Sequence, residues 1–193
     1  MIEIDMTSAR PSEELLRVDH LKVDFRTERG VVHAVDDVSY SLRRGEVLAV
    51  VGESGSGKSV SAMTLMGLTR SPNAEIGGTA TLADGTELVG ASDRQMRRIR
   101  GRRISMIFQD PMSALTPVYR VGDQISEQIR THEKVSRKAA RDRSIDLLRR
   151  VGIPKPAERA RRYPHEFSGG MRQRVMIAMA LSCSPEILIA DEP

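Results

Sequence analysis

The sequence lacks the features of several common protein classes. Its 193 residues include one cysteine, Cys183, so no disulfide can form within the chain and a reducing compartment is indicated. Aromatic residues make up 3%, and the formal net charge at pH 7 is only +4, so charge alone does not indicate a nucleic-acid binder. The four histidines have no second ligand at the spacing of a metal site: His20, His33, His132 and His165. A disulfide scaffold and a structural zinc site are therefore not expected.

Signals for secretion or membrane insertion are also missing. The N-terminal segment, "MIEIDMTSARPSEELL", is acidic and polar, without the charged, apolar and small-residue order of a signal peptide. No apolar run approaches the roughly 18 residues that span a bilayer. We therefore expect a soluble, cytoplasmic chain, in which any membrane role depends on a partner.

The apolar pattern predicts an α/β protein of one domain. Residues 1–14 are expected to be a flexible tail, and short β-type runs from Leu15 to Leu42 predict an antiparallel sheet. From Gly45 the pattern changes: "EVLAVVG" (46–52) is a continuously apolar strand, and "GKSVSAMTLMGL" (57–68) is a helix. A strand, a glycine-rich turn and a helix in this order are typical of parallel α/β folds.

The second half of the sequence alternates strands and helices. We predict a hairpin over residues 75–89, a buried strand over 103–108 and a helical insertion over about 111–162. A further helix, with Met171, Val175, Ala178 and Ser182 on one face, leads to a short buried strand, Ile187–Ala190. Cys183 is expected at a packed helix position, as a buried thiol rather than a reactive one.

An arginine-rich stretch, "DRQMRRIRGRR" (93–103), has two interpretations. It could be an RNA-binding arm, but it is short and has no interleaved aromatic residues for stacking. A solvated helix face fits it better.

The segment "GESGSGKS" matches the phosphate-binding pattern G-x-x-x-x-G-K-[ST] between a predicted strand and a predicted helix. Such a loop points its backbone N–H groups at phosphate oxygens, with Lys58 near the β- and γ-phosphates and the Ser59 hydroxyl on Mg²⁺. A merely structural glycine turn is the alternative. The candidate ATP-binding residues are Gly52, Glu53, Ser54, Gly55, Ser56, Gly57, Lys58 and Ser59.

The terminal "ILIADEP" places two carboxylates after an apolar strand. Beside a phosphate loop, Asp191 is expected to hold Mg²⁺, and Glu192 to orient and deprotonate the attacking water. Without the neighbouring phosphate loop, these two acidic residues would indicate only that the end of the strand is exposed to solvent.

Between these motifs, "FSGGM" starts a helix. Ser168 is placed to cap it, and Gly169 and Gly170 keep side chains away from its N-terminus. This could be a simple cap, but beside the phosphate loop it is a second anion site, which suggests that it serves a partner's nucleotide.

Together these motifs resemble the ATP-binding subunit of an ABC transporter. The match covers the chain from about Leu15 to its last residue, with Walker A at 52–59, a Q-loop glutamine at Gln109, the signature at 167–171 and Walker B at 187–192. The resemblance implies an ABC-type P-loop NTPase with an N-terminal antiparallel β subdomain, an incomplete RecA-like core and a helical insertion. It further implies that Phe25 stacks on adenine, unless it is a core residue, and that Gln109 contacts Mg²⁺ and the attacking water.

The segments "SMIFQDPM" and "YPHEFSGGMRQRVMIAMAL" are similar in sequence to the first ATPase subunit of oligopeptide and dipeptide importers. Nickel importers share much of the same sequence. The resemblance implies ATP and Mg²⁺ as cofactors and a peripheral place on the inner face of the cell membrane. The implied partners are a second ATP-binding subunit, permease subunits that contact the helical insertion and, indirectly, a substrate-binding protein; nucleic acid is not among them.

Relative to this family, we expect the sequence to lack the later D-loop, a further strand and the switch histidine, and His165 does not replace that histidine. The missing strand would lie between the two motif strands, so we expect the chain alone to be unstable or rearranged and unable to hydrolyse ATP. Two alternatives stay open: a non-catalytic nucleotide-binding module, and an ABC-type ATPase of DNA repair or translation.

Overall fold

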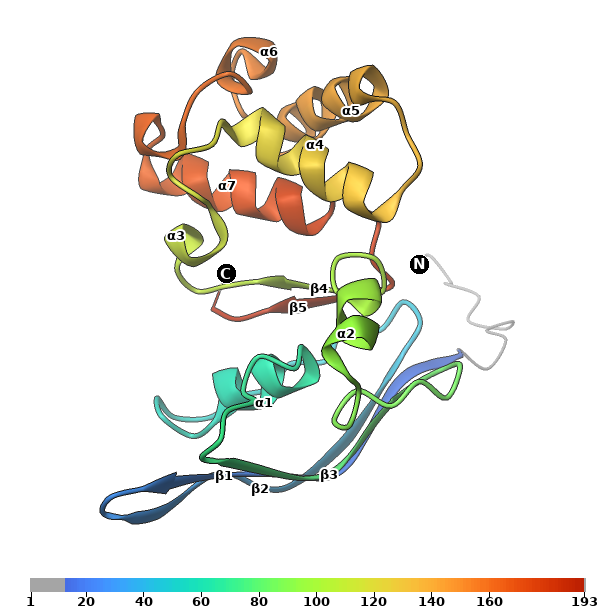
Figure 1. Cartoon of the computed structure of the whole chain (residues 1–193), viewed down its shortest axis with the longest axis vertical. Coiled ribbons are helices and arrows are strands. Elements are labelled where there is room, and N and C mark those ends of the chain that lie inside the picture. Colours follow the sequence, from blue (N-terminus) through green and yellow to red (C-terminus); the bar gives the residue numbers. More distant parts are fainter. Residues whose placement is uncertain (1–12, 193) are drawn as a thin grey trace, which may run out of the picture. The chain divides into compact units, whose positions relative to one another are not determined.

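The structure, a computed structural model, describes residues 13–192, which form two compact units, up to residue 92 and from residue 93 (Figure 1). Most of the predicted tail, residues 1–12, lies outside the described residues. The tail prediction is too long at its end, since the first strand already begins at Glu14.

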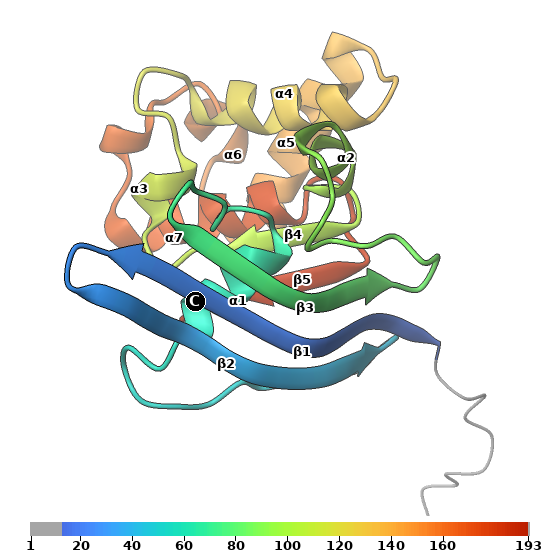
Figure 2. The same ribbon diagram turned by 60° about the horizontal axis from the view of Figure 1, so that its bottom comes forward.

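The first unit contains the predicted antiparallel sheet. Its strands are β1 (Glu14–Thr27), β2 (Gly30–Arg43) and β3 (Ala74–Leu82), in the order β2-β1-β3 (Figure 2). On the central strand β1, Leu16, Val18, Leu21 and Val23 are buried. Apolar residues at alternate positions lie on one face of a strand, which gives this sheet a buried side and a polar side.

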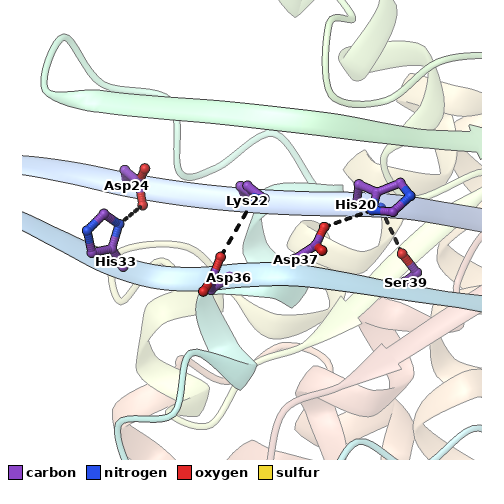
Figure 3. Close-up of polar contacts among 7 residues, drawn as sticks. All are labelled: His20, Lys22, Asp24, His33, Asp36, Asp37 and Ser39. Carbon is purple, nitrogen blue, oxygen red and sulfur yellow. Dashed lines mark hydrogen bonds and ion pairs between the residues drawn. The ribbon is translucent and has the colours of Figure 1, made fainter.

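The three strands share an irregularity at one level, shown for β1 and β2 in Figure 3. His20 and Asp37 both have left-handed backbone angles, with φ of 53° and 54°, and a hydrogen bond of 2.8 Å joins His20 Nδ1 to Asp37 Oδ1. The His20 N–H donates to the side-chain Oγ of Ser39 on β2, and not to a backbone carbonyl of that strand. On β3, Gly78 has φ +82°, and a Cβ there would lie 2.3 Å from the His20 carbonyl oxygen. These bulges bend the sheet, and the polar pairs secure the bend.

The predicted strand over residues 46–52 is wrong. No described strand pairs with this segment, and four of its apolar residues are exposed: Val47 (94%), Leu48 (41%), Val50 (56%) and Val51 (88%). An apolar run becomes a strand only when its N–H and C=O groups find partners on a neighbouring strand. The following helix is confirmed as α1 (Lys58–Leu65), shorter than predicted.

The predicted hairpin over residues 75–89 is confirmed in its first arm, which is β3, and in its turn. Gly85 has φ +81°, and the Leu82 N–H donates to the Thr86 carbonyl. The second arm pairs with β3 through one bridge rather than as a strand. It is held instead by the Arg70 guanidinium, which donates to the carbonyls of Leu88, Val89 and Ala91.

The second unit combines a parallel strand pair with helices. Strands β4 (Ile104–Ile107) and β5 (Ile187–Ala190) are parallel neighbours. The helices are α2 (Asp93–Ile99), α3 (Pro111–Ala114), α4 (Val121–His132), α5 (Arg137–Arg150), α6 (Pro156–Arg159) and α7 (Gly169–Ala180). The helical insertion is thus confirmed as α3 to α6. No helix of residues 13–192 has the length and apolar character to cross a membrane.

The core of this unit follows the predicted helical spacing. On α4, Val121, Ile125 and Ile129 are fully buried, and they pack in one cluster with Leu148 of α5 and Val175 of α7. Because residues three and four apart share a helix face, one stripe per helix supplies this core.

Two predictions for this unit need correction. The strand Ile187–Ala190 exists, but it is not fully buried, since Leu188 is 42% exposed. Cys183 is buried as expected, which raises the pKa of its thiol, but it lies in the turn after α7 instead of in a helix. Chain turns after a helix can bury a side chain without any periodic signal in the sequence.

Candidate functional site

The segment Gly52 to Ser59 forms a loop that closes around its own lysine. Lys58 Nζ donates to the carbonyl oxygens of Gly52 at 2.8 Å and Glu53 at 2.7 Å. The Ser56 N–H closes the loop further by donating to the Glu53 carbonyl at 3.2 Å. The ammonium group is therefore held at the mouth of the loop, directly before α1.

Two glycines give the loop its curvature. Gly55 and Gly57 have φ of +82° and +87°, which residues with a Cβ adopt only at a cost. A Cβ on Gly57 would also lie 1.9 Å from the Ala34 carbonyl oxygen of β2. Gly57 is the N-cap of α1, so the helix begins where its unsatisfied N–H groups and positive dipole end meet the loop. This arrangement fits the phosphates of a nucleotide.

Phe25 belongs to the same unit as the loop. It lies on β1 opposite Val32 of β2 and Ala74 of β3, and it is half-buried. Part of the residue is therefore exposed.

The structure brings Gln109 and Glu192 together. Parallel strands end at the same sheet edge, and Ile107 of β4 pairs with Ala190 of β5 two residues before each of these side chains. Gln109 Nε2 donates to Glu192 Oε2 at 2.7 Å. Glu192 has a left-handed backbone with φ +46°. The pairing continues one step past the strands, where the Asp191 N–H donates to the Ile107 carbonyl at 3.0 Å.

The oxygen atoms in these motifs suit Mg²⁺. Ser59 offers a hydroxyl, Asp191 a carboxylate and Gln109 its Oε1, since its Nε2 is engaged by Glu192. Hard cations prefer such oxygen ligands, and Mg²⁺ usually completes its shell with phosphates and water. Within residues 13–192, no group of three or more His, Cys, Asp or Glu side chains could hold a metal ion.

The signature segment begins α7 as predicted. Ser168 is the N-cap, and its Oγ accepts from the Met171 N–H at 3.4 Å. Ser168, Gly169 and Gly170 are all exposed, and a Cβ added at either glycine would meet nothing within 4 Å. The first residues of α7 are therefore exposed, and positions 169 and 170 carry no side chain that could cover the helix start.

A charged turn positions this helix start. Glu166 accepts from the Tyr163 N–H at 2.8 Å and from the Arg162 guanidinium at 3.0 Å. The hydrogen bond from the Tyr163 backbone is the largest cause of a lowered pKa for the Glu166 carboxyl. The turn is Pro164–Glu166, and the buried Phe167 links it to Ser168.

We expect the replacement Glu166→Ala to loosen this turn at neutral pH. Because the folded-state pKa is depressed, the carboxylate adds stability above its unfolded pKa, and this contribution is lost as pH falls through the folded pKa. Acid titrations followed by circular dichroism should show the difference between wild type and Glu166→Ala shrinking as the carboxyl protonates. The variant Glu166→Gln, which keeps an acceptor for the Tyr163 N–H, should lie between them. A difference that grows in acid would contradict this assignment.

The sequence motifs did not reveal two residues near Gln109. Asp110 caps α3 by accepting from the Met112 N–H at 2.9 Å, and the Asp-Pro pair is a signal for this that could have been used. Gln124 accepts from the Thr116 N–H and donates to the carbonyls of Thr116 and Tyr119, each at 2.9 Å. Gln124 thereby holds the loop that follows α3. In the sequence, nothing distinguishes this residue from an ordinary surface glutamine.

The functional side chains fall into both units. The phosphate loop and Phe25 belong to residues up to 92, whereas Gln109, the signature and Asp191–Glu192 belong to residues from 93. Of the predicted residues, the structure joins Gln109 with Glu192 directly, and Lys58 with Gly52 and Glu53.

The sequence of the chain is similar to those of known proteins. The sequence model described as "ABC transporter" matches residues 35–193. The dipeptide transport ATP-binding protein DppD of Bacillus subtilis is 53% identical over 181 residues, which cover 94% of this chain and 54% of that protein. The oligopeptide transport ATP-binding protein OppD of the same organism is 50% identical over 179 residues, 93% of this chain and 50% of that protein. The chain thus spans about half the length of these curated relatives.

The fold has a solved counterpart in a dimeric post-hydrolysis state of the ATP-binding cassette MJ0796 bound to ADP and Pi. The TM-score is 0.81 over 92% of this chain and 73% of that chain, at 23% identity, which supports the fold alone. The predicted α/β fold of the ABC-type P-loop class is confirmed. The family model covers most of the chain and the relatives share about half of its residues, so the chain belongs to the ABC transporter family.

Proposed function

We propose that the chain is the ATP-binding part of a subunit that powers the import of oligopeptides or dipeptides. The observation that carries the ATP-binding function is the loop Gly52 to Ser59, in which two left-handed glycines and Lys58 form a phosphate cradle at the start of α1. The peptide substrate rests on the names of the two relatives, which are peptide transport proteins.

Each group of residues would have a separate role in ATP binding and hydrolysis. The loop N–H groups and Lys58 bind the β- and γ-phosphates, and Phe25 stacks on the base. Ser59, Gln109 and Asp191 would hold Mg²⁺, which would supply charge neutralisation on the phosphate oxygens. Gln109 orients Glu192 through their 2.7 Å hydrogen bond, and the Glu192 carboxylate accepts the proton of the attacking water.

The open start of α7 supports a dimeric arrangement. Ser168 and Gly170 are exposed at the start of the helix, which suits the γ-phosphate of a nucleotide held by a second ATP-binding subunit. The helical insertion, α3 to α6, would contact permease subunits, and a substrate-binding protein would act through that permease. The chain would then lie at the inner face of the cell membrane.

The replacement Lys58→Ala tests this function. Lys58 would make charge-assisted hydrogen bonds to phosphate, each worth about 1.5–3 kcal/mol, so we expect ATP affinity to fall by about 100-fold. Isothermal titration with ATP and Mg²⁺ measures the effect. In the assembled transporter, the same change should stop ATP-dependent uptake of labelled peptide.

A suitable control is Lys138→Ala, because Lys138 is exposed on α5, far in sequence from the loop. It removes the same charge and should leave ATP affinity within about twofold. Equal affinities for wild type and Lys58→Ala would refute ATP binding at the loop. Uptake of Ni²⁺ in place of peptide would keep the ATP site but overturn the substrate class.

A further inference from the structure

An exposed arginine face on α2 and the turn after it has no role in the proposed reaction (α2 in Figure 1). Arg94, Arg97, Arg98 and Arg102 are all exposed, and within residues 13–192 none of their side chains forms a hydrogen bond or an ion pair, although the charge of Arg102 acts on His132. The first three are spaced i, i+3 and i+4, which places them on one side of the helix. By contrast, Arg103 of the same segment pairs with Glu186. We call the four exposed residues the arginine face.

Repulsion between the arginines of the arginine face destabilises α2. Like charges three and four residues apart repel each other by a few tenths of a kcal/mol per pair. The only acidic residue between positions 93 and 103 is Asp93, at the helix start. The seven-residue helix is held by the buried side chains of Met96 and Ile99. An anionic surface placed against the arginines would remove this repulsion.

Positive charge is also concentrated in the part of the chain that contains the arginine face. Residues 93–193 contain 21 Lys and Arg against 12 Asp and Glu, whereas residues 1–92 contain 9 against 14. The mild total of +4 hides this difference. A strong asymmetry between two parts of a chain indicates an interaction with a nucleic acid or a membrane surface.

The composition of the segment favours the membrane. Binding of single-stranded nucleic acid combines cations with aromatic side chains for base stacking, and no aromatic residue occurs from 93 to 107. Arginine guanidinium groups bind phosphate oxygens in a bidentate manner, and a row of cations suits a surface of phosphate headgroups without any stacking. Each Lys or Arg near an anionic bilayer adds to the attraction.

We propose that the arginine face binds the anionic lipid headgroups of a membrane directly. The contact would be made by this chain itself, in addition to any permease. It does not depend on ATP binding or on a peptide substrate, so a failure of the proposed function leaves this inference standing, and the reverse also holds.

Sedimentation with lipid vesicles tests the proposal. The purified chain should bind vesicles of equal parts phosphatidylcholine and phosphatidylglycerol, and should not bind pure phosphatidylcholine. The fourfold variant R94Q/R97Q/R98Q/R102Q should lower the partition coefficient by about 1,000-fold. Binding of wild type should weaken steeply as salt rises, because the Debye length shortens from about 30 Å at 0.01 M to about 3 Å at 1 M.

Two controls separate the arginine face from general charge and from misfolding. The variant K134Q/R137Q/K138Q/R141Q removes the same charge at similar spacing around α5 and should lose less than about threefold. Replacement of all four arginines by lysine should keep most of the binding, and circular dichroism should show equal folding of all variants. Equal losses in the two glutamine variants, or binding to single-stranded RNA with none to anionic vesicles, would overturn the proposal.

Discussion

Replacement of Glu192 by Gln should lower single-turnover ATP hydrolysis in the assembled transporter by about 10²- to 10⁴-fold, the usual contribution of a general base. Glutamine has the shape of glutamate, so the hydrogen bond from Gln109 Nε2 can still form to its side-chain oxygen. The proton acceptor is lost while the geometry is kept. ATP affinity should therefore stay within about threefold of wild type, because binding depends on the phosphate loop.

Two further variants sharpen this prediction. Glu127→Gln makes the same change at an exposed position of α4 and should leave hydrolysis unchanged. Gln109→Ala removes the group that orients Glu192 and one candidate oxygen ligand of Mg²⁺ but keeps the proton acceptor, so we expect a smaller loss than for Glu192→Gln. Rapid-quench measurement of phosphate release gives all three rates. Hydrolysis by Glu192→Gln at the wild-type rate would show that another group accepts the proton.

The substitution Gly57→Ala should destabilise the first unit by about 2–5 kcal/mol and abolish measurable ATP binding. The left-handed backbone costs a residue with a Cβ about 1–2 kcal/mol. In addition, the new Cβ would lie 1.9 Å from the Ala34 carbonyl oxygen, so the loop and β2 must move apart, which adds about 1–3 kcal/mol. Urea unfolding followed by circular dichroism measures the stability, and titration with ATP the binding.

A second glycine provides the matched control. Gly45 has a similar φ of +77°, but a Cβ there would meet nothing within 4 Å. Gly45→Ala should therefore cost only about 1–2 kcal/mol and should preserve ATP binding. If the two variants lose the same stability, the close approach of Gly57 to β2 is not important for the fold.

The local patterns in the sequence predicted elements whose stability depends on near neighbours. The spacing of Val121, Ile125 and Ile129 predicted the buried face of α4, since helical periodicity is a property of the chain itself. The glycines and lysine of residues 52–59 likewise predicted a phosphate loop, because their backbone freedom and charge act within eight residues.

Patterns that depend on distant partners were less informative. The segment 46–52 has the apolar composition of a strand, but strand formation requires a neighbouring strand, and no described strand pairs with it. The bulges at His20 and Asp37 carry no sequence signal, since they arise from the pairing of three strands. The role of Gln124 was hidden for the same reason, as its partners become apparent only when the loop is folded.

The sequence by itself predicted the chemistry that we propose for this protein, from a glycine-rich loop with a lysine, two carboxylates after a strand and a Ser-Gly-Gly helix start, and it also predicted the helices between residues 111 and 162. Only the tertiary structure decided that Gln109 contacts Glu192, across 83 residues of chain. It also decided that Lys58 donates to two loop carbonyls and that the side chains of Arg94, Arg97, Arg98 and Arg102 stay exposed. The physical reason is that residue types and their spacing specify local conformation, whereas contacts between distant residues form only when strands and helices pack together.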